Sequence, residues 1–341
     1  MKKWFLCLAT AAAFAKAPPP QPAFDADLFS RDKQVISTHL EFLYWVAEEG
    51  ALDYAIKMRS PAWSSSTDNY ASGNMKRTNF FFDPGFRLGM SFFRAPNYWE
   101  VWAMYTRMTS RGHTNAGKPG PTTEYINGTW PQILTAPLAG AETSIHLNYN
   151  LVDFLVDRFF NPNPHLRIRL IGGLTGAWMD QNWSIRYYDS SLNNSHIKSR
   201  WSYGGAGLRM GTMADWFWTH DIYLTARGTV GVLMGNYTNR TKQTSNISPT
   251  GAQNPAVPLR NVRYNDARPA VTGQLLIGPS YQKSFSTMRL EAFVGYEITG
   301  WGNLQEVYRS SSGSAQGAKE TWINTGLLTF QGITARITTD F

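Results

Sequence analysis

The chain ends with Gly332-Ile333-Thr334-Ala335-Arg336-Ile337-Thr338-Thr339-Asp340-Phe341, and this stretch decides the fold. Apolar residues occupy alternate positions, with polar residues between them. Strict alternation with period two is the pattern of a β-strand that has one apolar and one wet face. A bacterial transmembrane barrel closes through such a last strand, with its apolar side chains toward lipid. We therefore expect a barrel-insertion strand whose outward face carries Ile333, Ala335, Ile337 and Phe341.

Similar alternation predicts nine further strands upstream. They cover residues 39–46, 85–92, 99–108, 145–151, 166–178, 206–211, 221–236, 271–278 and 290–298. We expect the apolar set of each strand to face lipid, for example Ile145, Leu147 and Tyr149, and the polar set, such as His146, to face the lumen. The strand 99–108 is the exception, because its Trp102 and Met104 share a side with Glu100 and its facing is ambiguous. If both termini lie in the periplasm, the number of strands must be even. The sequence therefore predicts an all-β antiparallel transmembrane up-and-down β-barrel of about 10–12 strands, twelve if residues 52–58 add a hairpin.

The predicted connections alternate in length. Short turns are expected near residues 94–97, 212–220 and 282–287, and long loops at 110–140, 237–266 and 301–324. Outer-membrane barrels have short periplasmic turns and long extracellular loops, whereas a soluble secreted all-β domain has no reason to alternate in this way. The pattern therefore favours the barrel over the soluble domain.

The amino-terminal segment indicates export. Lys2 and Lys3 precede an apolar run over residues 4–14, and Ala13-Phe14-Ala15 is a cleavage site of the A-x-A type. These features predict a signal peptide over residues 1–15, a periplasmic linker over 16–36 and the barrel over 37–341. The single cysteine, Cys7, lies in the signal peptide, so the mature chain is expected to contain no disulfide.

Composition agrees with an outer-membrane protein of a Gram-negative bacterium. Only 16% of the residues are charged, against about 25% in typical globular domains, and 14% are aromatic. Tryptophan and tyrosine favour the lipid–water interface. We expect girdles formed by Tyr98, Trp99, Trp183, Tyr187, Tyr188, Trp201, Tyr203, Trp216, Trp218, Trp301 and Trp322. The net charge is +8, but the basic residues form no sequence cluster with stacking aromatics, so nucleic acid is not an expected partner.

Charged residues follow the polar positions of the strands. We predict a lumen lined by Arg87, Arg167, Arg169, Arg209, Arg227, Arg289, Glu291, Glu297 and Arg336. Arginine on the lipid face at mid-bilayer costs about 2–4 kcal/mol, whereas in a wet lumen it costs little. With Glu100 and Glu142 added, arginine outnumbers glutamate, which predicts a mildly anion-favouring lumen. The alternative is that arginine–glutamate pairs fill a narrow bore, because barrels of about ten strands are largely filled by side chains.

Several segments resemble the Legionella-type major outer membrane proteins, which are pore-forming barrels also found in chlamydia-related bacteria. They are Glu41-Phe42-Leu43-Tyr44-Trp45, Phe82-Asp83-Pro84-Gly85-Phe86-Arg87-Leu88-Gly89, Gly176-Ala177-Trp178-Met179-Asp180-Gln181 and the closing residues 332–341. The resemblance implies a porin-like outer-membrane protein with no catalytic residues to transfer. The absence of cysteine from the mature chain separates it from the cysteine-rich chlamydial proteins.

The predicted function is passive diffusion of small hydrophilic solutes or ions, without enzymatic activity, cofactor or metal. The alternative is a surface-exposed structural or adhesive barrel without an open channel. A barrel lipase or protease around His146, with Glu142, Asn148 and Asn150 nearby, is the third hypothesis. Expected partners are outer-membrane lipid, the barrel-assembly machinery, which would bind the last strand, and further copies of the chain in a homo-oligomer.

Overall fold

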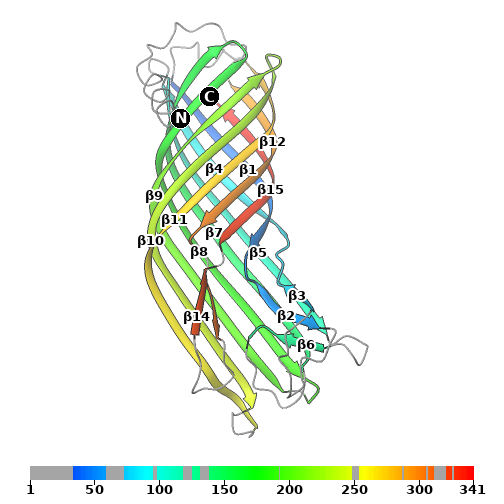
Figure 1. Cartoon of the computed structure of the whole chain (residues 1–341). Coiled ribbons are helices and arrows are strands. Elements are labelled where there is room, and N and C mark those ends of the chain that lie inside the picture. Colours follow the sequence, from blue (N-terminus) through cyan, green and yellow to red (C-terminus); the bar gives the residue numbers. More distant parts are fainter. Residues whose placement is uncertain are drawn as a thin grey trace, which may run out of the picture.

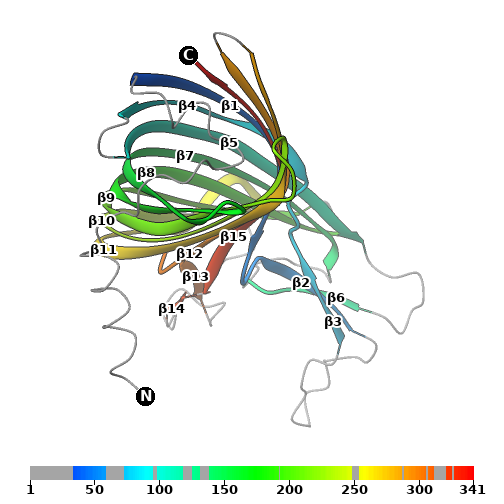
Figure 2. The same cartoon turned by 90° about the horizontal axis from the view of Figure 1, so that it is seen from above.

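The computed structural model describes residues 34–58, 73–94, 98–117, 125–130, 138–191, 193–247, 253–285, 288–304, 306–310, 320–324 and 326–341. Ten antiparallel strands close into one barrel (Figures 1 and 2). In order around the barrel they are β1 (Gln34–Glu49), β15 (Leu327–Asp340), β12 (Arg289–Gly302), β11 (Gln253–Ser284), β10 (Ile222–Ile247), β9 (Asn194–Phe217), β8 (Leu166–Asp189), β7 (Leu138–Asn163), β5 (Trp99–Gly117) and β4 (Phe82–Arg94). The predicted barrel is confirmed. The predicted signal peptide lies outside the described residues.

The last strand closes the barrel, as its alternation predicts. β15 pairs with β12 on one side and with β1 on the other, and Leu40 of β1 lies opposite Ile337. Beyond the end of β15, the backbone N–H of Phe341 donates to the carbonyl of Ile36 at 2.9 Å. Ile333, Ile337 and Phe341 are all more than half exposed. An exposed apolar row of this kind belongs against hydrocarbon rather than water.

The two ends of the barrel differ in their connections. The start of β1 and the end of β15, which we call the described termini, lie at the end of the barrel that holds the short turns 164–165 and 218–221 (Figure 1). The predicted turn at 212–220 is in part wrong, because β9 continues to Phe217. We call the half nearest the described termini the proximal half and the other the distal half. The predicted long loop 237–266 is wrong, because β10 and β11 continue as paired strands through most of it. The polar side chains there suit a wet strand surface as well as a loop.

Two small sheets accompany the distal half. β2 (Asp53–Met58) pairs with β3 (Gly73–Arg77) and β6 (Tyr125–Gly128), and β13 (Glu306–Ser310) pairs with β14 (Glu320–Asn324). Residues 52–58 therefore do not add a hairpin to the barrel, and the predicted loops 110–140 and 301–324 contain short strands. The Tyr187 hydroxyl donates to the carbonyl of Tyr54 at 2.6 Å, which ties β2 to the inside of β8.

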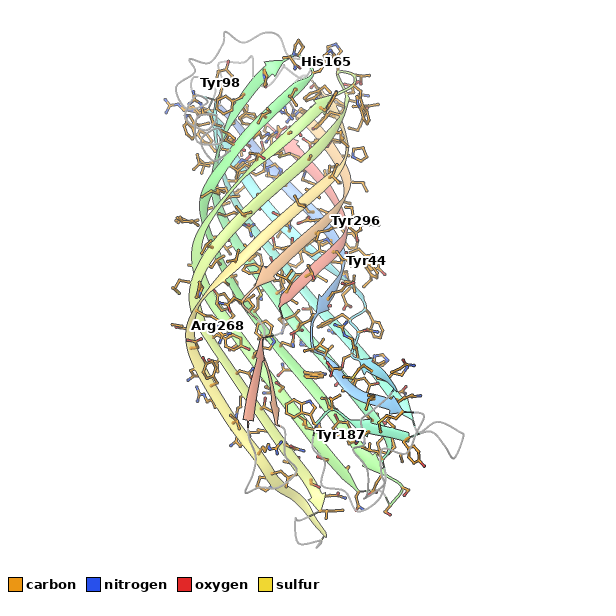
Figure 3. All side chains as sticks on the ribbon, in the orientation of Figure 1. Tyr44, Tyr98, His165, Tyr187, Arg268 and Tyr296 are labelled. Carbon is orange, nitrogen blue, oxygen red and sulfur yellow. The ribbon has the colours of Figure 1, made fainter. Side chains whose placement is uncertain are left out.

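The proximal half is apolar outside. On β10, exposed apolar residues run from Ile222 to Met234, with Val230 58% exposed. At about 3.3 Å per residue and a strand tilt near 40°, this stretch covers roughly 30 Å along the barrel axis, enough for a bilayer core. Exposed aromatic residues mark its two edges: Trp99, Trp216 and Trp218 near the termini, and Tyr44, Trp178 and Tyr296 at mid-length. Figure 3 labels Tyr44 and Tyr296 between the end with Tyr98 and His165 and the end with Tyr187.

The distal half reverses this polarity. Ile145, Leu147 and Tyr149 of β7 are buried inside, whereas His146 and Asn148 lie on the outer side. The predicted outward apolar face of residues 145–151 is therefore wrong. So is part of the predicted girdle, because five of its members are buried: Trp183, Tyr187, Trp201, Tyr203 and Trp301. Above the lipid edge the outer wall meets water, so the apolar face turns inward. No helix in the described part of the chain has the length and hydropathy needed to cross a membrane.

Candidate functional site: the barrel lumen

An ion-pair network crosses the lumen of the proximal half. Arg87 of β4 contacts the carboxylates of Glu41 on β1 and Glu297 on β12, the latter at 2.8 Å. β1 and β15 separate β4 from β12 in the wall, so the pair between Arg87 and Glu297 spans the interior. Glu297 also accepts hydrogen bonds from Gln274 and Thr334. These contacts satisfy a carboxylate that has no exposure to solvent.

Two more groups of pairs lie at other heights in the same half. Toward the termini, Arg289 contacts Asp340 at 2.7 Å and Arg336 contacts Glu291 at 2.8 Å. Because β12 and β15 are neighbours, both pairs lie flat along the wall rather than across the lumen.

The opposite wall carries the third group. Arg167 contacts Asp215 at 2.8 Å, and Arg209 contacts Asp153 at 3.0 Å across β8. Arg169 reaches Glu100 at 3.4 Å, and its guanidinium lies 4.4 Å from the centre of the Phe159 ring. Ion pairs and ring contacts together pack this side of the lumen.

Each arginine and glutamate predicted for the lumen is buried in the structure. An exposed fraction of 6% or less is common to Arg87, Arg167, Arg169, Arg209, Arg227, Arg289, Glu291, Glu297 and Arg336. Arg227 differs from the others, because no carboxylate of the described residues lies within ion-pair distance of it. Glu142, which the sequence placed on the same face, is instead exposed on the outer wall.

Sequence reasoning missed most of the acidic partners. Among the described residues, the proximal lumen holds seven buried arginines and eight buried carboxylates. The five carboxylates that were overlooked are Glu41, Asp153, Asp157, Asp215 and Asp340. They occupy the same strand parity as the arginines, so the alternation itself would have found them. The resulting near balance removes the basis for a strong anion preference.

Four aromatic side chains close the lumen where the two halves meet, and we call them the aromatic plug: Trp45, Tyr149, Trp301 and Phe330. The ring of Tyr149 on β7 lies 4.6 Å from Phe330 on β15, on the far side of the barrel. All four are at most 1% exposed. The guanidinium of Arg87 lies 5.6 Å from the centre of the Trp45 ring, which joins the ion-pair network to the plug.

Two small cavities lie among the charged side chains of the proximal lumen. One of about 30 Å³ is lined by His39, Glu100 and Arg169 among others, and another of about 20 Å³ by Glu41 and Arg227 among others. A water molecule needs at least about 10–15 Å³ measured in this way. Each of these two cavities therefore has room for only one or two waters.

The third hypothesis, a hydrolytic site at His146, receives no geometric support. His146 lies on the outer wall, and within the described residues its ring makes no hydrogen bond. A different pair does exist: Ser184 Oγ lies 2.7 Å from His196 Nε2 in an outer groove that also holds Glu142. No carboxylate of the described chain is hydrogen-bonded to His196, so an orienting group is missing. The described residues contain no group of three potential metal ligands.

The model of one protein family, described as the Legionella pneumophila major outer membrane protein precursor, matches residues 32–335 of this sequence. The chain belongs to this family. It is accordingly an outer-membrane β-barrel of a Gram-negative bacterium. In this setting the proximal half, with its short turns, is the periplasmic and membrane half, and the distal half is extracellular.

Three solved outer-membrane protein structures align with this chain at low similarity. The outer membrane protease OmpT from Escherichia coli aligns at a TM-score of 0.43 and 9% identity, over 92% of this chain and 99% of that one. The toluene transporter TbuX of Ralstonia pickettii aligns at 0.33 and 10% identity, over 91% and 89%. A FadL homologue of Pseudomonas aeruginosa aligns at 0.26 and 7% identity, over 93% and 92%. The comparison with curated protein sequences finds no match.

Proposed function

We propose that this family member is a narrow porin-like barrel that passes ions and small hydrophilic solutes when the aromatic plug moves aside. The charged inner wall of the membrane half supports this proposal most strongly. A lumen that only needs filling can use apolar residues, as the extracellular half of this barrel does. Replacing buried ion pairs by packed apolar residues is often neutral or stabilising. Seven arginines and eight carboxylates therefore suggest a lumen meant to hold water and ions.

The aromatic plug would act as the gate. Hydrophobic constrictions stop conduction by excluding water, and they open when a few side chains change rotamer. Trp45, Tyr149, Trp301 and Phe330 come from strands on opposite sides of the lumen, so a small movement of β15 against β7 would separate them. The selectivity of the open state would be weak, because the wall charges nearly cancel. Arg227, which has no ion-pair partner among the described residues, would supply what preference there is for anions.

Single-channel recording in planar bilayers tests this proposal. We expect rare, small conductance steps from the refolded wild-type chain, and at least several-fold more open time from the double variant Trp45→Ala/Trp301→Ala. Trp183→Ala is the matched control, because Trp183 is a buried tryptophan of the extracellular half outside the plug. In the opened variant, Arg227→Gln should shift the reversal potential toward cation preference. Absence of conductance from both wild type and double variant would contradict the proposal.

A second candidate is a structural or adhesive surface barrel that never conducts. The two small cavities in the lumen favour it, because neither has room for more than one or two waters. The long extracellular ends of β7 to β11 would then be the working part of the molecule. Silent bilayers with a correctly folded double variant would support this candidate.

We also propose that the chain has no enzymatic activity. Neither His146 nor the pair of Ser184 and His196 has the third group that a hydrolytic site requires. Assays of ester and peptide hydrolysis test this statement, with His146→Ala and Ser184→Ala as controls. Activity that Ser184→Ala abolishes would contradict it.

The barrel-assembly machinery is the partner we propose for the end of β15. Phe341 is 62% exposed and follows an outward apolar row, which leaves it available for recognition during insertion. Phe341→Ala should lower the yield of assembled barrel in cells, whereas refolding into lipid vesicles without that machinery should change little. Equal yield in cells would contradict this role.

A further inference from the structure

Basic residues gather on the outer wall of the extracellular half. Arg200 of β9, Arg240 of β10 and Arg263 of β11 lie directly opposite one another in a single row. In the next row outward, Lys198 lies opposite Lys242. We call these five residues the basic patch. All five side chains are exposed on the outer face. They are separated by up to 65 positions in the sequence, so only the register of the strands brings them together.

The positive charge of the patch is not compensated. Like charges directly opposite each other on a sheet are destabilising, and here three such contacts occur on adjacent strands. Within the described residues, no carboxylate lies within ion-pair distance of any member. Arg240 Nε donates to Asn261 at 3.3 Å, which orients the guanidinium without neutralising it. An uncompensated cluster of positive charge of this kind attracts anions.

A groove of about 350 Å³ follows the patch. It is lined by His196, Lys198, Arg200, Arg240, Lys242 and Thr244. His196, at its edge, shares a 2.7 Å hydrogen bond with Ser184. Partial burial, followed by the charges of Lys198 and Arg186, lowers the pKa of the His196 imidazole. The volume of the groove is that of a small-molecule site, and the lysine and arginine side chains on its walls can donate hydrogen bonds.

The height of the patch above the lipid identifies the kind of anion. The row of Ala206, Met234 and Pro269 is the last apolar row on the outer wall of these strands. Two neutral rows follow before the row of Arg240. Three row spacings of about 6.6 Å along tilted strands place the arginines roughly 15 Å above the hydrocarbon edge. A phospholipid headgroup reaches only about 5–7 Å above that edge, so it is too short to fill the patch.

We propose that the basic patch binds the phosphorylated sugar headgroup of an outer-leaflet glycolipid. Its acyl chains would lie against the outward apolar rows of β9 to β11, and its sugar phosphates would reach the arginines. Guanidinium groups bind phosphate oxygens in pairs, which suits three arginines in one row. This inference does not depend on whether the lumen conducts.

The test measures glycolipid binding by the refolded full chain. The barrel is placed in phosphatidylcholine nanodiscs, and titrated with deep-rough lipopolysaccharide that retains its inner-core phosphates. The double variant Arg240→Gln/Lys242→Gln removes two charges from the patch. The matched control is Arg107→Gln/Arg111→Gln, which removes two exposed arginines from the outer wall of β5. Two further arms use the same glycolipid after dephosphorylation, and phosphatidylglycerol at equal charge.

We expect the patch variant to bind the phosphorylated glycolipid at least tenfold more weakly than wild type, and the control variant to stay within twofold. Wild type should bind the dephosphorylated glycolipid and phosphatidylglycerol no more tightly than the patch variant binds the phosphorylated glycolipid. Equal affinity of the patch variant and wild type would overturn the proposal. Equal binding of phosphatidylglycerol would overturn it as well, because the height argument would then fail. Circular dichroism of each variant confirms that the barrel has folded.

Discussion

The membrane half and the extracellular half of this barrel use the same strands with opposite chemistry. On β10, Val230 is 58% exposed and Arg227 is buried, whereas further along the same strand Tyr237 is buried and Arg240 is exposed. The pleat and the parity of the strand do not change between these points. The surroundings do: lipid covers one half of the outer wall and water covers the other.

This comparison shows that alternation alone defines two faces without saying which one points inward. In the membrane half, hydrocarbon outside sends every charge into the lumen, where ion pairs must satisfy it. In the extracellular half, water outside lets the polar face turn outward, and the interior packs into a core with the aromatic plug at its base. The following predictions test the difference between the two halves, beginning with the largest expected effect.

Truncating an interior charge should be the most damaging change. Glu297→Ala removes one of the two carboxylates that pair with the buried Arg87, and it also leaves the buried donors of Gln274 and Thr334 without their acceptor. We expect a loss of about 3–5 kcal/mol in the free energy of unfolding. Urea titration of the barrel in lipid vesicles measures it. Glu48→Ala, on the exposed outer side of β1, should change stability by less than about 0.5 kcal/mol.

The free-energy cost of an arginine on the outer wall should depend on its position along the barrel axis. Val230→Arg places a charge in the lipid belt and should cost about 2–4 kcal/mol. Thr238→Arg, on the same face of β10 in the extracellular half, should cost less than about 1 kcal/mol. The same urea titration compares the two, and equal costs would show that the lipid edge does not lie between them.

Removing one methylene group should cost more stability in the extracellular core than on the lipid-facing surface. Ile145 is buried in the extracellular core, so Ile145→Val should lose about 1 kcal/mol. Ile277 faces lipid and is 54% exposed, so Ile277→Val should lose less than about 0.5 kcal/mol, because lipid tails fill the space. If the lipid-facing change proved the costlier one, the interior packing described for β7 would be wrong.

The smallest effect concerns the protonation of His196. Its pKa in the folded chain lies below the ordinary 6.5, chiefly because of partial burial and then because of Lys198 and Arg186. The unfolded chain therefore takes up this proton at higher pH than the folded one, so the stability contribution of His196 is lost as pH falls below about 6.5. NMR titration of the imidazole measures the pKa directly, and Lys198→Gln should raise it. An unchanged pKa in that variant would exclude the proposed influence of the basic patch.

Much of the fold could be predicted from the sequence, because strand alternation is a local signal. The ten strands and the outward row of β15 follow from residues such as Ile333 and Ile337 read two by two, whereas the predicted turn 212–220 was too long because β9 continues to Phe217. The reversal of polarity on β7 could not be predicted, because Leu147 and His146 alternate in the same way whichever side is wet. Nor could the pairing of Arg87 with Glu297, since it depends on closure across two intervening strands.

The site was predicted in part. The nine charged residues expected in the lumen are buried together, but their role in a pore remains a prediction. The overlooked carboxylates, such as Asp153 and Asp215, changed the expected charge balance. The aromatic plug was not predicted, because Trp301 and Tyr149, when each strand is considered alone, resemble aromatic residues of the lipid–water interface.

Spin-label accessibility tests the reversal of polarity most directly. Single labels are placed at Val230, His146 and Leu147 of a chain that lacks the predicted signal peptide and with it Cys7, the one cysteine of the sequence. Their collision rates with oxygen and with a water-soluble nickel complex are compared in lipid vesicles. We predict that oxygen reaches the label at Val230, that nickel reaches the label at His146, and that neither reaches the label at Leu147. High oxygen access at Leu147 together with shielding of His146 would contradict the account, because the extracellular half would then have the same polarity as the membrane half.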